Sequence, residues 1–539
     1  MTGGKAGTQW WRSAVLYQVY PRSFQDDDGD GMGDLKGITR RLEHVAGLGC
    51  DGIWLSPFFR SPMADMGYDV SDYTDVDPLF GTLADFDGLI ARANTLGLKI
   101  IIDQVLNHTS DRHAWFRESR SSRTNPKADW YIWAEPREDG SPPNNWPSVF
   151  GGPAWTWDGE RQQYYMHSFL SQQPDLNYRN PEVVDAVMDT MRFWLDRGVS
   201  GFRVDACNHM TKDDRLRDNP PKAFPAGERK PFNHYDWQLQ VYSKSRPENL
   251  DLLRRMRAVA EEYDDIMLVG EVGDVDRAIE LMGEYTSGED KLHMAYSFDM
   301  LGPKYTPEHF RKVIQGFRDG APEGWPLWSM SNHDVVRHVT RWAGRDAGED
   351  ALARQAISLL TSFEGAICLW QGEELGQTQT DLDYEELTDP MGLRFWPADK
   401  GRDGCRTPMV WEAAAPHGGF SAVAPWLPVK PPQAARAVDA QAGQGGSMLE
   451  AYRTAIAHRK ATPALHSGPM HILAAEDPLF RFTRGTGAER LDCIYNLDRG
   501  TITVPCPDPC AISGPAQAAT LSGDMLTLGP NGWAHLRKI

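Results

Sequence analysis

The sequence predicts an α/β protein, a (β/α)8 TIM barrel with a small domain inserted after the third strand and an all-β domain at the carboxyl end. Three observations predict it. Eight short apolar strands alternate with helical segments along most of the chain. The apolar run in a strand such as Lys99–Val105 is continuous, as a parallel strand covered on both faces requires. Short alternating segments after Gly468 are typical of antiparallel strands.

The elements follow in a regular order. We expect strands over residues 15–20, 52–56, 99–105, 201–205, 266–270, 292–298, 326–330 and 366–370. We expect helices over residues 38–48, 83–96, 181–197, 250–263, 275–285, 307–317, 351–363 and 448–459. In the third of these helices the apolar positions fall three and four apart, which is the helical spacing: Val183, Val187, Met191 and Trp194.

The alternation is interrupted twice. A stretch rich in Trp, Pro, Asn and Gly covers residues 107–176 and is expected to be the inserted domain. A long excursion follows the eighth strand at about residues 375–446. The barrel therefore comprises residues 1–106 and 177–465. Residues 466–539 are expected to form a β-sandwich, because short strands in close succession are typical of one.

Composition limits the classes of partner. The chain has 539 residues and a net charge of -19, which argues against nucleic acid or an anionic membrane as partner. Its seven cysteines lack a zinc-like spacing, and we expect reduced thiols. Residues 1–5 lead into Trp10 and Trp11 without an apolar segment, so no signal peptide is expected. We expect a cytoplasmic monomer or homodimer that acts on a small, uncharged or cationic ligand.

An acidic loop follows the first strand. Its aspartates lie two apart with a glycine for the turn, like the first part of a calcium loop, although Gly37 stands where that loop has its last glutamate. A structural Ca²⁺ or Mg²⁺ is one interpretation, and a solvated acidic turn is the other. The expected metal-binding residues are Asp26, Asp28, Asp30, Met32 and Asp34.

Polar residues gather at the carboxyl ends of four strands. They are Asn107-His108, Arg203 and Asp205, Glu271, and Asn332-His333-Asp334. In a barrel all these ends lie on one face, where active sites are built. A structural ion pair would explain Arg203 and Asp205 alone, but burying three carboxylates together is costly without a function.

These groups suit one reaction better than others. No HExxH zinc motif, GxSxG elbow, P-loop or dinucleotide fingerprint is present. Two carboxylates can break a glycosidic bond, one as nucleophile or base and the other as acid. A third can stabilise the sugar cation that develops.

Several motifs resemble those of the α-amylase superfamily of glycoside hydrolases, in its α-glucosidase and oligo-1,6-glucosidase branch. The resemblance extends from Trp10 into the carboxyl-terminal domain. It is carried by residues 103–108 (DQVLNH), 173–177 (QPDLN), 201–209 (GFRVDACNH), 270–272 (GEV), 331–334 (SNHD), 372–376 (GEELG) and 401–409 (GRDGCRTPM).

The resemblance implies a retaining mechanism. Asp205 would form a covalent β-glucosyl enzyme, and Glu271 would protonate the leaving oxygen and then activate water. Asp334 would hold the sugar 2- and 3-hydroxyls. His108, His333 and Arg203 would hold hydroxyls and orient Asp205, with Asp103 behind them. The raised pKa of an acid/base and a carboxyl separation of roughly 5–5.5 Å are expected.

The branch also closes the pocket at the non-reducing end of the sugar. By resemblance Asp65 would bind the 4-hydroxyl beside Arg402, and Tyr68 would stack on the glucose ring. Phe150 and Phe169 would form aromatic walls. The expected activity is therefore exo-acting removal of one terminal glucose.

The residue after the nucleophile bears on the linkage. In this branch valine goes with α-1,6 bonds and alanine or threonine with α-1,4 bonds. Ala206 therefore favours maltose-like α-1,4 glucosides. A sucrose hydrolase or a transglucosylase that uses the same residues stays open as the alternative. A non-catalytic transporter subunit with this fold is the rival from another class, and the retained carboxylates argue against it.

Overall fold

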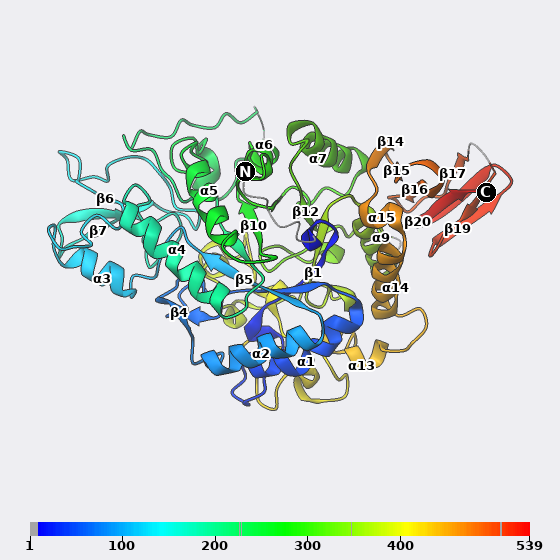
Figure 1. The fold of residues 1–539 in the computed structure, drawn as a ribbon, viewed down its shortest axis with the longest axis horizontal. Helices are drawn as coiled ribbons and strands as arrows, with labels where there is room; N and C mark the ends of the chain where they lie inside the picture. The colour runs from blue at the N-terminus through cyan, green and yellow to red at the C-terminus, as the bar shows by residue number, and fades with distance from the viewer. Residues whose placement is uncertain (1–8, 226, 228, 347, 507–508) are drawn as a thin grey trace.

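The computed structural model describes residues 9–225, 227, 229–346, 348–506 and 509–539. Residues 1–8, on which the expectation of a missing signal peptide partly rests, lie outside the described residues. Figure 1 shows a central barrel, a domain coloured cyan at one side and the carboxyl-terminal sheet, coloured orange to red, at the other. The predicted α/β barrel with an all-β carboxyl-terminal domain is confirmed.

Eight parallel strands make the barrel. In chain order they are β1 (Val15–Val19), β2 (Gly52–Leu55), β5 (Lys99–Val105), β9 (Gly201–Asp205), β10 (Met267–Val272), β11 (Met294–Ser297), β12 (Leu327–Ser329) and β13 (Ala366–Trp370). They pair in the order β11-β10-β9-β5-β2-β1-β13-β12. A parallel bridge between Ala295 and Pro326 joins β11 to the start of β12, so the ring closes.

Both faces of each strand are buried, which explains the continuous apolar runs. Leu16, Trp54 and Ile101 point into a cluster inside the barrel. Tyr17 and Ile53, the next residues along two of these strands, pack in the larger core beneath the helices. Successive side chains along a strand therefore point alternately into the barrel interior and towards the helices, and both surroundings are apolar.

Helices cover the outside of the barrel. The main ones are α1 (Leu35–Leu48), α2 (Leu83–Thr95), α4 (Pro181–Asp196), α5 (Asn249–Ala260), α6 (Ala278–Thr286), α7 (Pro307–Gly320), α9 (Glu349–Ser362) and α14 (Met448–Ala461). Shorter ones are α8 (His338–Arg341), α10 (Pro390–Phe395), α11 (Asp403–Arg406), α12 (Pro431–Ala434), α13 (Val438–Gln441) and α15 (Pro463–Ser467).

Two helix starts differ from the expectation. Helix α1 begins at Leu35 and not at Ile38, because Asp34 caps it by accepting a hydrogen bond from the Gly37 amide. Helix α6 begins at Ala278 and not at Val275, because the Asp274 carboxylate holds the amide of Arg277 in a turn. The second difference leaves Val275 in the loop after β10.

Three further groups of strands complete the fold. A two-stranded pair, β3 (Phe59–Arg60) and β4 (Asp72–Val76), follows β2 and was not predicted. Helix α3 (Ala114–Ser121) precedes an antiparallel sheet of β6 (Trp133–Ala134), β8 (Gln163–Met166) and β7 (Trp155–Asp158), within the expected insertion.

The carboxyl-terminal strands are all antiparallel. They are β14 (Met470–Glu476), β15 (Leu479–Arg484), β16 (Leu491–Asn496), β17 (Ile502–Pro505), β18 (Cys510–Ile512), β19 (Gln517–Ser522) and β20 (Met525–Lys538). The long strand β20 pairs with β16, β17, β18 and β19. All seven cysteines are free. Among the described residues, every helix is too short or too polar to cross a membrane.

Candidate active site

The predicted site residues line one cavity at the carboxyl ends of the barrel strands. Its volume is about 690 Å³. The cavity is lined by Asp65, Tyr68, His108, Phe150, Phe169, Asp205, Glu271, His333, Asp334 and Arg402. Of the predicted catalytic and substrate-binding residues, Arg203 is the one buried beneath this lining, with no exposed surface.

Arg203 joins the two carboxylates proposed to react. One guanidinium nitrogen lies 2.6 Å from Asp205 Oδ1, and the other contacts Glu271 Oε2. The register of β9 and β10 explains this arrangement, because Val204 pairs with Gly270 and the next residues are Asp205 and Glu271. Neighbouring parallel strands thus place both carboxylates at one edge of the barrel.

A tyrosine that the sequence did not single out completes this group. The Tyr296 hydroxyl, at the end of β11, donates to Glu271 Oε2 at 2.6 Å and accepts from Arg203 Nε at 3.1 Å. Asp103, on β5, lies 2.7 Å from Arg203 Nη1. The guanidinium is therefore held from three other strands as well as its own, and its position is fixed before a ligand enters.

Burial and charge compete at Asp205. Burial raises the pKa of Asp205 to about 6, and the neighbouring Arg203 opposes that rise. A carboxyl group with this pKa is about nine-tenths ionised at pH 7, since one pH unit is a factor of ten. Asp205 is therefore mostly ionised at neutral pH, as a nucleophile must be.

Asp334 lies among cations. Burial alone would raise its pKa, but the surrounding positive charges hold the pKa of Asp334 well below its usual range. Burial lowers the pKa of His333 and keeps that ring neutral, so the arginines supply the charge. Arg406 Nη2 lies 2.9 Å and Arg402 Nη1 lies 3.3 Å from Asp334 Oδ1. Asp334 is accordingly a fixed anion.

An ion-pair network around Arg402 lines the end of the cavity that we interpret as its closed end. Arg402 Nη2 lies 3.0 Å from Asp65 Oδ1 and 2.7 Å from Asp389 Oδ1. The guanidinium also lies over the Phe150 ring, 5.3 Å from its centroid. Asp389 carries no predicted role, because it lies in the irregular excursion after β13, where the chain offers no periodic pattern.

Aromatic and imidazole rings form the walls beside this network. The Tyr68 ring stacks parallel to His333 at 5.4 Å, and its hydroxyl lies 2.5 Å from His333 Nε2. One face of Tyr68 is therefore occupied within the protein, and the other can meet a ligand. Phe169 packs against His108 at 5.2 Å and against Phe150 at 5.8 Å.

Two further polar side chains belong to this cavity without a predicted role. The Gln173 amide nitrogen lies 3.1 Å from Asp65 Oδ2 and 3.1 Å from His108 Nε2. Both ring nitrogens of His209 are buried and have no partner among the described residues. The motifs of the family contain both residues, so the sequence could have indicated them.

The acidic loop brings part of its predicted metal-binding set together. One oxygen from each of Asp26, Asp28 and Asp34 lies within 4.8 Å of the others. Asp30 lies outside that group and accepts a hydrogen bond from the Met32 amide at 2.7 Å. Three carboxylates fit Ca²⁺ or Mg²⁺, which prefer oxygen ligands. Left-handed Gly29 and Gly31 form the turn between them.

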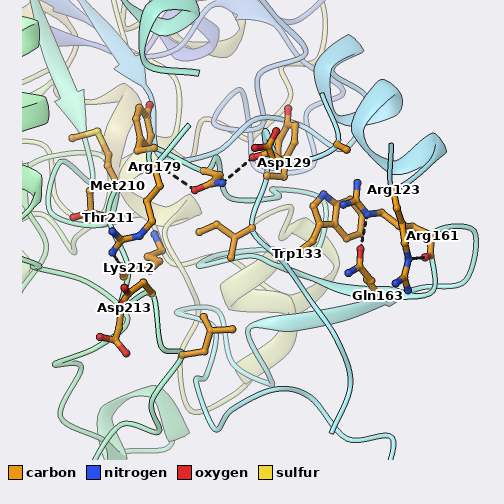
Figure 2. Close-up of a pocket in the computed structure, with 17 residues that line it drawn as sticks. Arg123, Asp129, Trp133, Arg161, Gln163, Arg179, Met210, Thr211, Lys212 and Asp213 are labelled. Atoms are coloured by element: carbon orange, nitrogen blue, oxygen red, sulfur yellow. Dashed lines mark hydrogen bonds between the residues drawn. The ribbon is translucent and has the colours of Figure 1, made fainter. Parts of the chain in front are cut away.

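Another cavity, of about 360 Å³, lies where the inserted domain meets the loop after β9 (Figure 2). Its lining includes Trp133, Gln163 and Lys212, and none of the predicted site residues. Lys212 is engaged, since its ammonium lies 2.9 Å from Asp175 and 2.8 Å from Asn107 Oδ1. The residues expected to do chemistry therefore lie in the first cavity.

Comparisons with known proteins agree with one another. Residues 18–468 match the model of the alpha-amylase catalytic domain. A probable alpha-glucosidase of Rhizobium meliloti is 55% identical over 502 residues, covering 92% of this chain and 91% of the relative. An oligo-1,6-glucosidase of Heyndrickxia coagulans is 35% identical over 538 residues, covering 93% and 94%.

Solved structures extend the comparison. The alpha-glucosyl transfer enzyme XgtA superposes with a TM-score of 0.95 at 48% identity, covering 98% of this chain and 99% of that one. The trehalulose synthase MutB, as an A258V mutant in complex with Tris, superposes with a TM-score of 0.88 at 31% identity, covering 98% and 100%.

Proposed function

Because the chain belongs to the alpha-amylase family of glycoside hydrolases, we propose that it is an exo-acting, retaining α-glucosidase that removes terminal α-1,4-linked glucose from short, maltose-like glucosides. One observation carries the proposal. Asp205 and Glu271 touch the same guanidinium, and both line the cavity that the Asp65–Arg402 ion pair also lines.

The first displacement follows from this geometry. Asp205 Oδ attacks the anomeric carbon while Glu271 gives its proton to the leaving oxygen, so one C–O bond forms as another breaks. The Tyr296 hydroxyl and Arg203 position the Glu271 carboxylate. Asp334, held as an anion by Arg402 and Arg406, binds sugar hydroxyls and faces the positive charge that develops on the ring.

The second displacement returns the enzyme to its starting state. The Glu271 carboxylate removes a proton from water, and the resulting oxygen nucleophile attacks the anomeric carbon and releases Asp205. Two inversions leave the product in the α configuration. An alcohol that replaces water at this step gives transglucosylation by the same residues.

Support for exo action comes from the closed end. Asp65 and Gln173 offer oxygen and nitrogen atoms to a terminal sugar, and Arg402 and Phe150 block further extension. A chain could enter only with its non-reducing end first. Ala206 supports the α-1,4 preference by the family pattern.

A second candidate is a transglucosylase or sucrose-cleaving enzyme. It is favoured by the likeness to proteins named an alpha-glucosyl transfer enzyme and a trehalulose synthase. We also propose a structural Ca²⁺ or Mg²⁺ at the acidic loop, a cytoplasmic location, and a monomer or homodimer.

A substrate panel tests the proposal. Maltose, isomaltose and sucrose are supplied separately, and products are identified by chromatography and by the anomer first released, using proton NMR. We expect α-glucose from maltose, with isomaltose and sucrose cleaved more slowly. Release of β-glucose would contradict retention, and fructose-containing isomers from sucrose would favour the second candidate.

A further inference from the structure

A third cavity lies outside the two described above, where the strand pair β3–β4 meets the start of helix α3. Its volume is about 630 Å³, and it shares no lining residue with either of the others. Three of the side chains that line it are arginines, namely Arg60, Arg112 and Arg117, and we refer to it as the arginine cavity. Three cations gathered in one cavity contrast with the net charge of -19 on the chain.

Packing between the strand pair and the helix holds the walls of the arginine cavity in place. The Ser110 amide donates to the Val70 carbonyl at 2.7 Å. The ring of Tyr73, on β4, lies 5.6 Å from the ring of His113, whose side chain caps α3 by accepting from the Trp115 amide at 3.1 Å. Tyr73 and His113 are both buried. The backbone that carries the arginines is therefore positioned before a ligand enters, which lowers the entropic cost of binding.

Two of the three arginines have side chains without a partner. Arg60 is engaged, since its Nε lies 2.5 Å from Asp75 Oδ2. The guanidinium groups of Arg112 and Arg117 make no hydrogen bond or ion pair with any residue that the structure describes, and both residues are exposed. Because each guanidinium carries several N–H donors in one plane, two sets of donors are open to a ligand.

The carboxylates of the arginine cavity are occupied by other donors. Asp72 Oδ1 accepts from the amide and from the hydroxyl of Thr74, at 2.8 Å each. Asp77 accepts from the Ser61 amide at 2.9 Å and from the Leu79 amide at 3.0 Å. These bonds hold both aspartates within the strand pair and its turns, so the charge of the two open arginines is not neutralised by a contact inside the cavity.

We propose that the arginine cavity binds a phosphate group, as inorganic phosphate or as the phosphomonoester of a small molecule. A phosphate group carries about -1.5 to -2 charges at pH 7 and several acceptor oxygens. Arginine binds such oxygens through two parallel N–H donors, and two open guanidinium groups match a doubly charged anion. A carboxylate, with a single charge, matches them less well.

The start of α3 favours a ligand of the same charge. Ala114, the first residue of this helix, also lines the cavity, and the first turn contains no acidic residue. The amino-terminal end of a helix carries a partial positive charge, which stabilises a nearby anion. This contribution is smaller than that of two full charges, so the affinity should depend mainly on Arg112 and Arg117.

Isothermal titration calorimetry of the full-length protein tests the proposal. Inorganic phosphate, glucose 6-phosphate and glucose are titrated separately at fixed pH and ionic strength, with chloride as the other anion. We expect saturable binding of both phosphate-bearing probes, and the glucose titration measures any binding through the sugar alone. Tighter binding of glucose 6-phosphate than of phosphate would identify a phosphomonoester as the ligand. Equal affinities would show that the phosphate group alone is recognised.

Variants locate the bound phosphate. In Arg112→Gln combined with Arg117→Gln, the Kd for phosphate should rise about tenfold or more, because the charged hydrogen bonds are lost. Arg112→Lys combined with Arg117→Lys keeps the charge but not the paired donors, and it should give a smaller rise. The matched control is Arg490→Gln combined with Arg537→Gln, which removes the same charge from two exposed arginines of the carboxyl-terminal domain. Its Kd should equal that of the unaltered protein.

Three results would overturn the phosphate site. They are absence of saturable phosphate binding by the unaltered protein, unchanged affinity in the glutamine variant of Arg112 and Arg117, and an equal loss of affinity in that variant and in the control. The last result would mean that net charge alone sets the affinity. Because the arginine cavity shares no lining residue with the cavity that contains Asp205 and Glu271, each of these results is independent of the proposed glucosidase activity.

Discussion

Arg402 and Asp65, 337 positions apart in the chain, form an ion pair of 3.0 Å at the closed end of the cavity. The same guanidinium reaches Asp334 and Asp389. One side chain from the excursion after β13 thus connects the loop between β3 and β4, the loop after β12 and its own segment. The pocket is complete only when all three segments are folded.

Arg402→Lys should therefore weaken substrate binding more than an arginine-to-lysine change at an exposed ion pair. Lysine keeps the charge but cannot donate to three carboxylates in a plane. We expect kcat/KM for maltose to fall about a hundredfold, the effect of losing one or two charged hydrogen bonds. Arg254→Lys is the control, because its pairs with Asp251 and Asp290 are exposed. Equal activity of the two variants would contradict the role of Arg402.

Substitution of the two proposed catalytic carboxylates should have different effects on activity. Asp205→Asn should lower kcat by about three orders of magnitude or more, because no covalent intermediate can form. Glu271→Gln should lower hydrolysis of maltose comparably but still react with 4-nitrophenyl α-glucoside, whose leaving group needs little protonation.

Azide distinguishes the roles further. It needs no general base, so it should accelerate turnover of Glu271→Gln and yield α-glucosyl azide by two inversions, and it should not restore Asp205→Asn. Circular dichroism of both variants checks the fold. Near-normal maltose hydrolysis by either variant would refute the assignment.

The pH profile follows from Asp205. Burial raises the pKa of Asp205 to about 6, with Arg203 opposing. A carboxyl group is protonated below its pKa, and only the ionised form attacks, so kcat/KM should fall tenfold per unit below about pH 6. An exposed aspartate would give a limb near pH 4. The pH dependence of kcat/KM reports an ionisation of the free enzyme. The decrease at acidic pH should therefore occur at the same pH with maltose and with isomaltose. Full kcat/KM at pH 5 would exclude this ionisation.

Ala206, the residue expected to influence the linkage preference, also has an unusual backbone conformation. Its φ is 45°, in the left-handed region that a β-branched residue rarely adopts. Ala206→Val should lower the kcat/KM ratio of maltose to isomaltose by about tenfold, and destabilise the protein by roughly 1–3 kcal/mol. Ala206→Gly is the control, since glycine adopts this φ freely. An unchanged ratio in a folded Ala206→Val protein would remove Ala206 as the linkage determinant.

The acidic loop gives a test by metal removal. If Ca²⁺ or Mg²⁺ binds at Asp26, Asp28 and Asp34, EDTA should lower Tm, because a ligand at about a hundred times its Kd stabilises the native state by about 2.7 kcal/mol. Asp28→Asn should abolish this response, and in EDTA it should be at least as stable as the unaltered protein, since like charges are relieved. An unchanged melting curve with EDTA would leave an acidic turn without a metal.

The sequence was sufficient for the barrel and for the residues at its strand ends. Continuous apolar runs predict which segments are buried strands. The polar residues that follow them predict where the site lies, because the carboxyl ends of parallel strands in a closed sheet lie on one face. Val204 and Gly270 illustrate this, since their pairing alone brings Asp205 and Glu271 to neighbouring positions.

What the sequence by itself determined was the periodic part of the protein: the barrel, its insertions and the carboxyl ends of its strands. Only the tertiary structure decided that Tyr296, Asp389 and Arg406 join the site, and that Val275 and Val336 border it. Side chains on irregular loops meet through distances in space, and no spacing along the chain encodes those distances.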